Sequence, residues 1–552
     1  MKGIRVILSV AVFIVGSLTL RVGADQNGAG SAQLQLVEAT IGQMEKALQT
    51  KLLTTEQLVG MYLDRVAAYD KTGPAVNAFI HLNSDALSEA RLADALRHPG
   101  IARSPLEGIP VILKDNINTF DMPTTAGSVA LAGSIPPDDA FITKKLRAAG
   151  AIILGKGTLT EFANFISSNM PTGYSSLGGF GFNPYDPRPL PGGDGRPVLQ
   201  TGGSSSGPAI AVNANLAAIG IGTETSGSIL SPSSANGVVG IKPTVGLVSR
   251  SGIIPITADQ DTAGPIARTV EDAALMLGVI AGFDAADPAT AQCLTPGKCF
   301  SDYTKFLDKH ALRGARIAVP PFPTNRATIM NAAIAVLRAQ GADVETIPAV
   351  PSGLGTCISF PPPAGCSTVL MYGMKRDLNA YLAATPNAPN HTLTQIIAFN
   401  AAFNPPMKYG QDILIATDML NISPGSADTS RYLSDRAQDL ANSRGALDAV
   451  YNGPDGVKGT ADDFDAILAS ANSFAGTPAK AGYPSVTVPG GFLPPAAPIV
   501  NPFPSGVTFS GPAFSEPRLI ALAYAYEQAT LNRIPPASTP PLPTDSVGRP
   551  AK

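Results

Sequence analysis

Gly-Gly-Ser-Ser-Ser-Gly at residues 202–207 and Gly-Thr-Glu-Thr-Ser-Gly-Ser at residues 222–228 are the two stretches that decide the fold prediction. Between them a helix is expected to begin at Pro208, and residues 216–221 (LAAIGI) predict a strand, so one helix-and-strand step separates the two stretches. Glycine allows backbone conformations closed to other residues and close approach to a ligand. Taken alone, residues 202–207 also fit a serine-rich linker.

The second stretch has the pattern of an anion-binding turn. Gly227 precedes Ser228, and a tight turn at this point can present a hydroxyl beside a row of backbone N–H groups. Such N–H groups, aimed at one point, stabilise the oxyanion of an acyl-transfer intermediate. The stretch is therefore a candidate catalytic segment.

A buried lysine is predicted upstream of both stretches. Residues 108–113 (GIPVIL) predict a short buried strand that ends at Lys114, and Asp115 and Asn116 follow it. Burial lowers the pKa of a lysine, and a neutral lysine can act as a general base. We therefore expect this lysine to be either paired with a charge or neutral and useful in catalysis.

The rest of the chain alternates helix and strand signals. A capping box at Thr54 and Gln57 opens one helix. Further helices are expected at residues 84–98, 141–149, 269–283 and 517–529, and further strands at residues 151–154, 484–488 and 506–509. This alternation predicts the α/β class. Residues 169–207 break it with a glycine- and proline-rich segment, and a long irregular segment in a compact domain is usually functional.

One large domain is expected between two short terminal segments. The predicted divisions are a signal peptide at residues 1–24, a polar segment at 25–35, the folded domain at 36–536, its variable, substrate-shaping region at about 288–477, and a loose proline-rich tail at 537–552. A length of 552 residues with 44% hydrophobic content supplies ample material for a large core.

The N-terminus has the pattern of a secretory signal. Lys2 and Arg5 form a short positive region, residues 6–20 are apolar, and residues 22–24 (VGA) offer small side chains for cleavage before Asp25. The apolar run is shorter than a comfortable membrane span. Export to the periplasm or the medium is therefore predicted, and a retained N-terminal anchor is the alternative.

Four cysteines form two pairs that are close in sequence, Cys293 with Cys299 and Cys357 with Cys366. An oxidising compartment favours two local disulfides, although four cysteines permit three connectivities. Zinc is the rival interpretation, but neither pair has the spacing of metal ligands. Two local disulfides are therefore preferred.

Two other kinds of ligand are disfavoured. The net charge is −3 and no run of Lys and Arg stands out, so the basic patch that a nucleic-acid partner requires is not visible. Residues 452–465 (NGPDGVKGTADDFD) have the composition of a calcium loop, but they miss the twelve-residue EF-hand spacing and its closing glutamate. A solvated turn is favoured there over a calcium site.

Taken together, the motifs resemble the amidase signature family. The landmarks are residues 105–116 (PLEGIPVILKDN), 202–207 (GGSSSG) and 222–229 (GTETSGSI). Further matches are residues 235–247 (ANGVVGIKPTVGL), 481–489 (AGYPSVTVP) and 516–532 (EPRLIALAYAYEQATLN). The resemblance extends from about residue 37 to about residue 536, and all of the motifs in this order are highly specific.

The resemblance implies a fold and a mechanism. The fold is a mixed, twisted β-sheet with helices on both faces, and neither a metal nor an organic cofactor is implied. Ser228 would be the nucleophile that forms an acyl-enzyme, and Lys114 would draw its proton through the hydroxyl of Ser204, which the family holds with a cis peptide bond. Backbone N–H groups for the oxyanion would come from Thr225, Ser226, Gly227 and Ser228.

The chain departs from the family pattern beside the nucleophile. Glu224, Ser226 and Leu230 occupy places where members commonly carry Asp, Gly and Arg, so Glu224 must be satisfied without the arginine. A glutamate without that arginine is similar to the bacterial peptide amidases, which release ammonia from the C-terminal amide of peptides. Residues 169–175 (NMPTGYS) also resemble that branch. The resemblance therefore favours peptide or small acyl amides as substrates.

Two residues near the motifs carry two interpretations each. By its position in the family, Met170 is expected near the acyl pocket, and a core methionine is the alternative. Ser205 is expected to hydrogen-bond within the proton relay, and a structural turn serine is the alternative.

Other functions stay open at this point. Residues 203–207 also match the G-x-S-x-G pattern, in which Ser205 would be the nucleophile and His310 or His391 its base. The same cleft could serve a catalytically silent binding protein. A transamidating subunit acting on charged transfer RNA shares the fold, but the export signal and the lack of a basic surface disfavour it. The same mechanism could also act on anilides, carbamates, fatty-acyl amides or esters.

Overall fold

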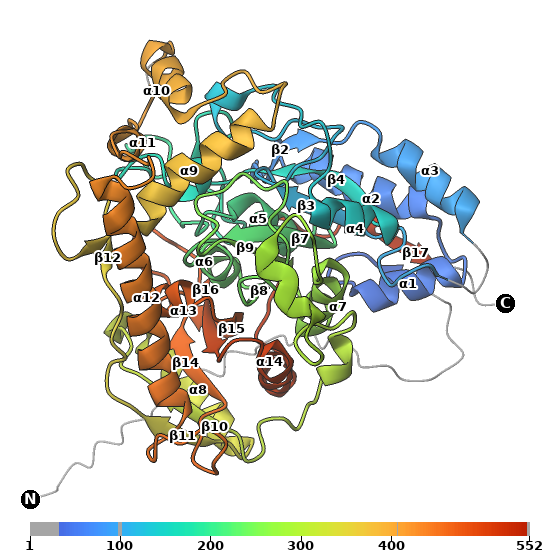
Figure 1. Cartoon of the computed structure of the whole chain (residues 1–552). Helices are drawn as coiled ribbons and strands as arrows, with labels where there is room; N and C mark the ends of the chain where they lie inside the picture. The colour runs from blue at the N-terminus through green and yellow to red at the C-terminus, as the bar shows by residue number, and fades with distance from the viewer. Residues whose placement is uncertain (1–32, 98–101, 406, 549–552) are drawn as a thin grey trace, which may run out of the picture.

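The computed structural model describes residues 33–97, 102–405 and 407–548, so the predicted signal peptide lies outside the described residues (Figure 1). Its centre is an eleven-stranded sheet. In spatial order the strands are β11 (Asp343–Thr346), β10 (Arg316–Val319), β14 (Ala466–Ser470), β16 (Phe503–Ser510), β15 (Ser485–Leu493), β8 (Val239–Lys242), β9 (Thr262–Ala267), β7 (Ile219–Glu224), β3 (Pro110–Lys114), β4 (Ile152–Gly157) and β2 (Phe79–Leu82). Parallel pairs such as β3–β7 occur beside antiparallel pairs such as β7–β9, so the predicted mixed sheet is confirmed.

Helices cover both faces of this sheet. The helices are α1 (Ile41–Gln49), α2 (Thr55–Tyr69), α3 (Ala86–Leu96), α4 (Phe141–Ala148), α5 (Ser206–Asn213), α6 (Leu230–Ala235), α7 (Val270–Ile280), α8 (Ala327–Ala339), α9 (Val369–Ala383), α10 (Leu393–Ala402), α11 (Asp412–Asp418), α12 (Ala427–Tyr451), α13 (Gly476–Ala481) and α14 (Glu516–Thr530). α7 and α14 pack on one face of the sheet, and α5 and α6 pack on the other. The predicted α/β class with helices on both faces is confirmed.

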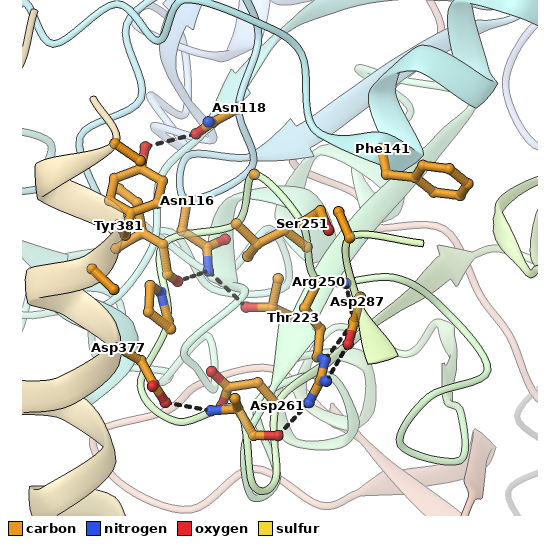
Figure 2. A pocket seen from close by; sticks show the side chains of 18 of the residues that line it. Asn116, Asn118, Phe141, Thr223, Arg250, Ser251, Asp261, Asp287, Asp377 and Tyr381 are labelled. Carbon is orange, nitrogen blue, oxygen red and sulfur yellow. Dashed lines mark hydrogen bonds and ion pairs between the residues drawn. The ribbon is translucent and has the colours of Figure 1, made fainter. Parts of the chain in front are cut away.

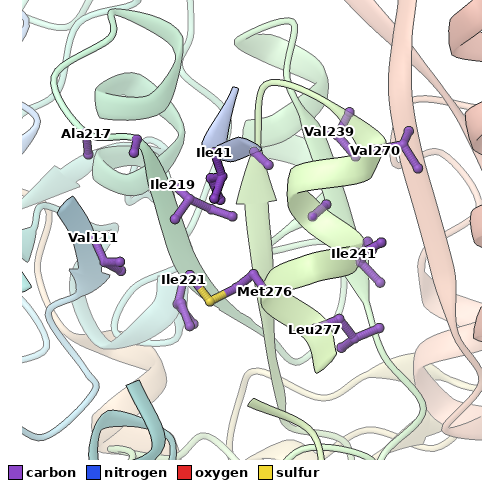
Figure 3. Packing of buried hydrophobic residues seen from close by; sticks show 14 of the residues in the cluster. Ile41, Val111, Ala217, Ile219, Ile221, Val239, Ile241, Val270, Met276 and Leu277 are labelled. Carbon is purple, nitrogen blue, oxygen red and sulfur yellow. The ribbon is translucent and has the colours of Figure 1, made fainter. Parts of the chain in front are cut away.

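Strand β7 has large apolar side chains on one face of the sheet and glycines on the other. Side chains alternate along a strand, and Ile219 and Ile221 point into the main core beside Met276 of α7 (Figure 3). Gly220 and Gly222 alternate with these isoleucines and lie on the opposite face. A Cβ atom on Gly222 would lie 2.7 Å from the Ser205 Oγ atom. The glycines therefore let the serine-rich stretch and α5 lie directly against the sheet.

The predicted variable region builds a second layer. Helices α9 to α12 carry their own apolar core, which includes Met371, Leu378 and Leu414 and also takes in Phe165 and Met170 from the irregular segment. These helices lie together at one side of the sheet in Figure 1. This second layer is thus built largely from residues after position 369.

Several element boundaries differ from the predictions. Strand β7 continues to Glu224 rather than ending at residue 221, because Glu224 still pairs with Thr262 of β9. Helix α5 begins at Ser206 rather than Pro208. Hydrogen bonds to neighbouring strands extend β7 beyond its apolar residues, which the apolar pattern alone does not reveal.

Each of the two terminal segments contains a strand that the sequence did not predict. Strand β1 (Gln33–Gln35) pairs antiparallel with β17 (Ser546–Gly548), so the predicted polar segment ends in a strand. Arg65 of α2 is fully buried and pairs with Asp545 at 2.5 Å. The prediction of a loose tail is therefore wrong as far as Gly548, because a buried arginine anchors the tail to the body of the domain.

Both predicted disulfides are present. Cys293 pairs with Cys299 and Cys357 with Cys366, with Cα atoms 4.9 and 5.1 Å apart. No helix among the described residues has the length and apolar character needed to cross a membrane.

The loop at residues 452–465 is held by its own hydrogen bonds. The carboxylates of Asp462 and Asp463 accept backbone N–H groups from Asp455 and Gly459. In the described parts of the chain, no group of three or more His, Cys, Asp or Glu residues could hold a metal ion. Residues 452–465 thus form a turn in which two carboxylates are bound by backbone N–H groups of the same loop.

Candidate active site

Strands β3 and β7 bring the predicted lysine to the serine-rich stretch. They are parallel neighbours, so their carboxyl ends lie at the same edge of the sheet, and Leu113 is paired with Ile221. Lys114, at the end of β3, is fully buried. Its Nζ atom lies 2.7 Å from the Ser204 Oγ atom and 2.8 and 3.2 Å from the hydroxyl and carbonyl oxygens of Thr223. The predicted contact between Lys114 and Ser204 is thus present.

The surroundings of Lys114 favour its neutral form. Burial lowers the pKa of Lys114 to about 7, although the charges of Asp261 and Glu224 act in the opposite direction. Within the described chain no carboxylate forms an ion pair with it. A neutral amine has two N–H groups and one lone pair, and the two oxygens of Thr223 can accept both N–H groups. The lone pair is then left to face the Ser204 hydroxyl, which is the arrangement that a general base requires.

Two other fully buried lysines show what distinguishes Lys114. Lys156 has a carboxylate partner, Asp115, at 3.5 Å, and Lys242 donates to the carbonyl oxygen of Tyr483 at 2.6 Å. Burial also lowers the pKa of each of these lysines, to about 8. Among these three buried lysines only Lys114 contacts a serine hydroxyl.

Ser204 is held on both sides. The peptide bond between Gly203 and Ser204 is cis, and the Ser204 carbonyl accepts the N–H of Thr160 at 3.1 Å. One residue further on, the Ser205 N–H donates to the Ser228 carbonyl at 3.2 Å, which ties the two serine-bearing turns together. In the described chain the Ser204 and Ser228 hydroxyls are not hydrogen-bonded to each other.

Three of the four predicted oxyanion donors are free. Among the described residues, the N–H groups of Thr225, Ser226 and Ser228 have no hydrogen-bond acceptor. All three residues line a cavity of about 400 Å³ together with Met170. Unpaired backbone N–H groups in the wall of a cavity can stabilise a developing negative charge.

The N–H of Gly227, the fourth predicted oxyanion donor, is already used by another group. This N–H donates to Glu224 Oε1 at 2.7 Å, while Glu224 Oε2 accepts the N–H groups of Ile229 and Leu230 at 2.7 and 3.1 Å. The glutamate is therefore satisfied by three backbone groups in place of the absent arginine. Because Glu224 occupies the Gly227 N–H, that group is not free for an oxyanion.

Ser205 contacts the strand rather than the Ser204 hydroxyl. Its hydroxyl donates to the Thr223 carbonyl at 3.1 Å and accepts the Thr223 N–H at 3.2 Å. The structure contradicts a role for Ser205 as an elbow nucleophile, because its hydroxyl is hydrogen-bonded to the Thr223 backbone and not to His310 or His391, which are exposed at the surface. Among the described residues, no histidine lines the cavity at Ser228 or its larger neighbour.

Two residues near the lysine were not assigned from the sequence. Thr223 contacts Lys114 directly, and the amide of Asn116 donates to the Thr223 hydroxyl at 3.0 Å and to the Ile254 carbonyl at 3.3 Å. Both residues belong to the quoted motifs. The register that places β3 beside β7 is what reveals their role.

A second cavity of about 700 Å³ adjoins the first (Figure 2). The two share Ala163, Thr225 and Ile256 in their walls. Asp261, in the wall of the larger cavity, accepts the Thr225 hydroxyl at 2.5 Å and the Ile256 N–H at 2.8 Å, and burial raises the pKa of Asp261 to about 6. Asp261 therefore fixes the turn that carries the free N–H groups.

Comparisons with known proteins agree with the motifs. The amidase family model matches residues 57–359. A protein described as "Probable amidase" from Arabidopsis thaliana is 37% identical over 94% of this chain and 95% of its own length. The similarity to that protein therefore extends over nearly the whole of both chains.

Solved structures show the same similarity in three dimensions. The native peptide amidase from Stenotrophomonas maltophilia superposes with a TM-score of 0.76 at 39% identity, covering 91% of this chain and 99% of that protein. An amidase family protein from Bacillus anthracis superposes with a TM-score of 0.80 at 34% identity, covering 91% of this chain and 92% of its own. The family match alone spans more than half of the 552 residues. The chain therefore belongs to the amidase signature family and is an amidohydrolase.

Proposed function

We propose that this amidohydrolase cleaves a C–N amide bond through an acyl-enzyme on Ser228. The observation that carries the proposal is a buried lysine, hydrogen-bonded to Ser204, beside three unpaired N–H groups around Ser228. A base, a bridging hydroxyl and an anion site are the three parts that such chemistry needs.

In the proposed first step the Ser228 oxygen attacks the amide carbonyl carbon. The Ser228 proton passes to the Ser204 oxygen as the Ser204 proton passes to the Nζ atom of Lys114. The carbonyl oxygen becomes an oxyanion, which the N–H groups of Thr225, Ser226 and Ser228 would stabilise. The proton then returns along the same path to the amide nitrogen, the C–N bond breaks, and ammonia or an amine leaves.

Water completes the proposed cycle by the same relay. It gives a proton toward Lys114, attacks the acyl carbon and releases the acid, and Ser228 recovers its proton. The relay requires a hydrogen bond between the Ser228 and Ser204 hydroxyls to form when the substrate binds. Catalytic hydrogen bonds in unliganded enzymes often form only when the substrate is bound.

We propose peptide C-terminal amides or small acyl amides as substrates. The similarity to a peptide amidase over nearly all of that protein supports this choice. Of the described residues that line the cavity at Ser228, none is charged, and Met170, Leu370 and Ile413 contribute apolar surface. An uncharged acyl group ending in a neutral amide suits such a lining better than a free carboxylate, which would have no partner.

We also propose that the protein is exported after cleavage before Asp25. The two disulfides support this proposal, because disulfides persist in oxidising compartments. The positive and apolar N-terminal residues supply the signal.

The first prediction concerns turnover. Purified protein should release ammonia from amidated dipeptides, and Ser228→Ala should abolish this release. Lys114→Ala should reduce kcat/KM by several orders of magnitude, because losing one member of a relay removes the function of the whole. Ser206→Ala is the matched control: its hydroxyl has no hydrogen-bond partner among the described residues, and its activity should be retained.

Full activity of Ser228→Ala would refute the mechanism. If only anilides, esters or fatty-acyl amides are cleaved, the mechanism stands and the substrate proposal fails. No turnover of any of these compounds would favour a silent binding protein.

The second prediction concerns pH. Because burial lowers the pKa of Lys114 to about 7 and only the neutral amine accepts a proton, kcat/KM should rise with pH and level off above about pH 8. A neutral N-acetyl dipeptide amide avoids titration of the substrate. Asp261→Asn should keep the rising limb and move its midpoint downward, because the variant removes a negative charge that favours protonated Lys114. If Asp261→Asn no longer shows the rise of kcat/KM with pH, the group that titrates is Asp261 and not Lys114.

The third prediction concerns export. When the chain is expressed in a bacterium with its own N-terminus, N-terminal sequencing of protein from the periplasm or medium should begin at Asp25. An uncleaved chain retained with the membrane fraction would support the anchor alternative instead.

A further inference from the structure

One segment of the variable region reaches the cavity at Ser228. Thr356 and Ile358 both line the cavity, and Cys357 between them is buried. The chain then runs through Ser-Phe-Pro-Pro-Pro-Ala-Gly and returns to Cys366, which is bonded to Cys357. We refer to residues 356–366 as the cavity loop.

A strand pair and a disulfide join the two ends of the cavity loop. β12 (Gly355–Thr356) and β13 (Cys366–Ser367) are paired in parallel, and the Cys357 N–H donates to the Ser367 carbonyl at 2.9 Å. The disulfide adds a covalent closure at the same place. A short ring of residues closed in this way has far fewer conformations than an open one.

The far side of the cavity loop is held from α12. The Arg431 guanidinium donates to the carbonyl oxygens of Pro362, Pro363 and Cys366 at 2.7, 2.5 and 3.2 Å. Prolines have a fixed φ and no N–H group, so three in succession stiffen this side of the loop further. The cavity loop is therefore rigid where it passes the cavity.

Ile358 presents the loop's apolar surface to the cavity. Ile358 is 42% exposed, so part of its apolar surface is open to a ligand in the cavity that it lines. An acyl group bound at Ser228 and long enough to reach Ile358 would cover it. A group that fills the cavity of about 400 Å³ covers more of Ile358 than a small acyl group does.

From these contacts we infer that the cavity loop sets the acyl-group specificity of the enzyme, favouring bulky apolar acyl groups through Ile358. The inference rests on the proposed function, because it assumes that the acyl group occupies the cavity at Ser228. A wall that is already ordered binds a bulky group without the entropy cost of ordering a slack loop. The disulfide and Arg431 act as positioning groups, since neither cysteine lines the cavity.

The second disulfide supplies a matched control. Cys293 and Cys299 also close a short loop, but the Cys293 sulfur lies against the carbonyl oxygens of Gly246 and Leu247. Neither cysteine lines either of the two cavities described above. Opening this disulfide removes a covalent closure of similar length without touching the proposed acyl pocket.

The test compares ammonia release from N-acetylglycinamide and N-acetylphenylalaninamide. For the double variant Cys357→Ser with Cys366→Ser, kcat/KM for the bulky amide should fall about tenfold through KM, the scale of one lost apolar contact, and the small amide should change less than about twofold. Arg431→Ala keeps the disulfide and should shift the same ratio in the same direction. The double variant Cys293→Ser with Cys299→Ser should leave the ratio of the two kcat/KM values unchanged.

The inference is overturned if both cysteine double variants change the ratio of the two kcat/KM values equally. It is also overturned if neither Arg431→Ala nor the Cys357–Cys366 double variant changes that ratio. If the wild-type protein releases no ammonia, the proposed hydrolysis is what fails. Calorimetric binding of the two amides to Ser228→Ala, with and without the Cys357–Cys366 pair, then decides the inference separately. A weakened preference for the bulky amide upholds it, and an unchanged preference refutes it.

Discussion

The Nζ atom of Lys114 has no access to water, and its three oxygen neighbours are the contacts on which the rest of the site depends. An unpaired buried ammonium would cost several kcal/mol, on the order of the penalties measured for buried ions. The neutral amine avoids that cost and is at the same time the form that can accept a proton. Stability and reactivity therefore require the same protonation state at this position.

The neighbouring backbone is arranged to keep these contacts. Glycines on one face of β7 let the serine-rich stretch lie against the strand, which brings Ser204 to Lys114. Glu224 gathers three N–H groups of the following turn, and Asp261 holds the Thr225 hydroxyl at its start. Thr225, Ser226 and Ser228, whose N–H groups remain unpaired among the described residues, all line the cavity. Two buried carboxylates thus shape the turn without pairing with the lysine.

Much of this arrangement could be predicted from local sequence, and the rest depends on contacts between distant residues. The glycine and serine motifs, the strand before Lys114 and the close cysteine pairs are local signals, and the structure places them as expected. The role of Thr223 depends on the register of β3 against β7. The use of the Gly227 N–H depends on how far the Glu224 side chain reaches, and the anchoring of the tail depends on Arg65 and Asp545, which are 480 residues apart. None of these three features leaves a periodic or compositional trace.

The proposed reacting groups and part of the cavity wall come from different parts of the chain. The sheet supplies the proposed base, and the turns beside it supply the proposed bridging serine and anion site. The layer after residue 288 contributes to the cavity wall Thr356, Ile358, Leu370, Ile413 and Asn472. The chemistry can stay constant in such an arrangement while the wall changes its substrate.

The central claim is that Ser228 carries the acyl group, and trapping the intermediate tests it most directly. Turnover of an activated ester of N-acetylphenylalanine is stopped in acid, and the digested protein is mapped by mass spectrometry. The acyl mass should appear on the peptide that contains Ser228, and on no peptide of Ser228→Ala. An acyl group on Ser204 or Ser205, or the same adduct in the variant, would contradict the central claim.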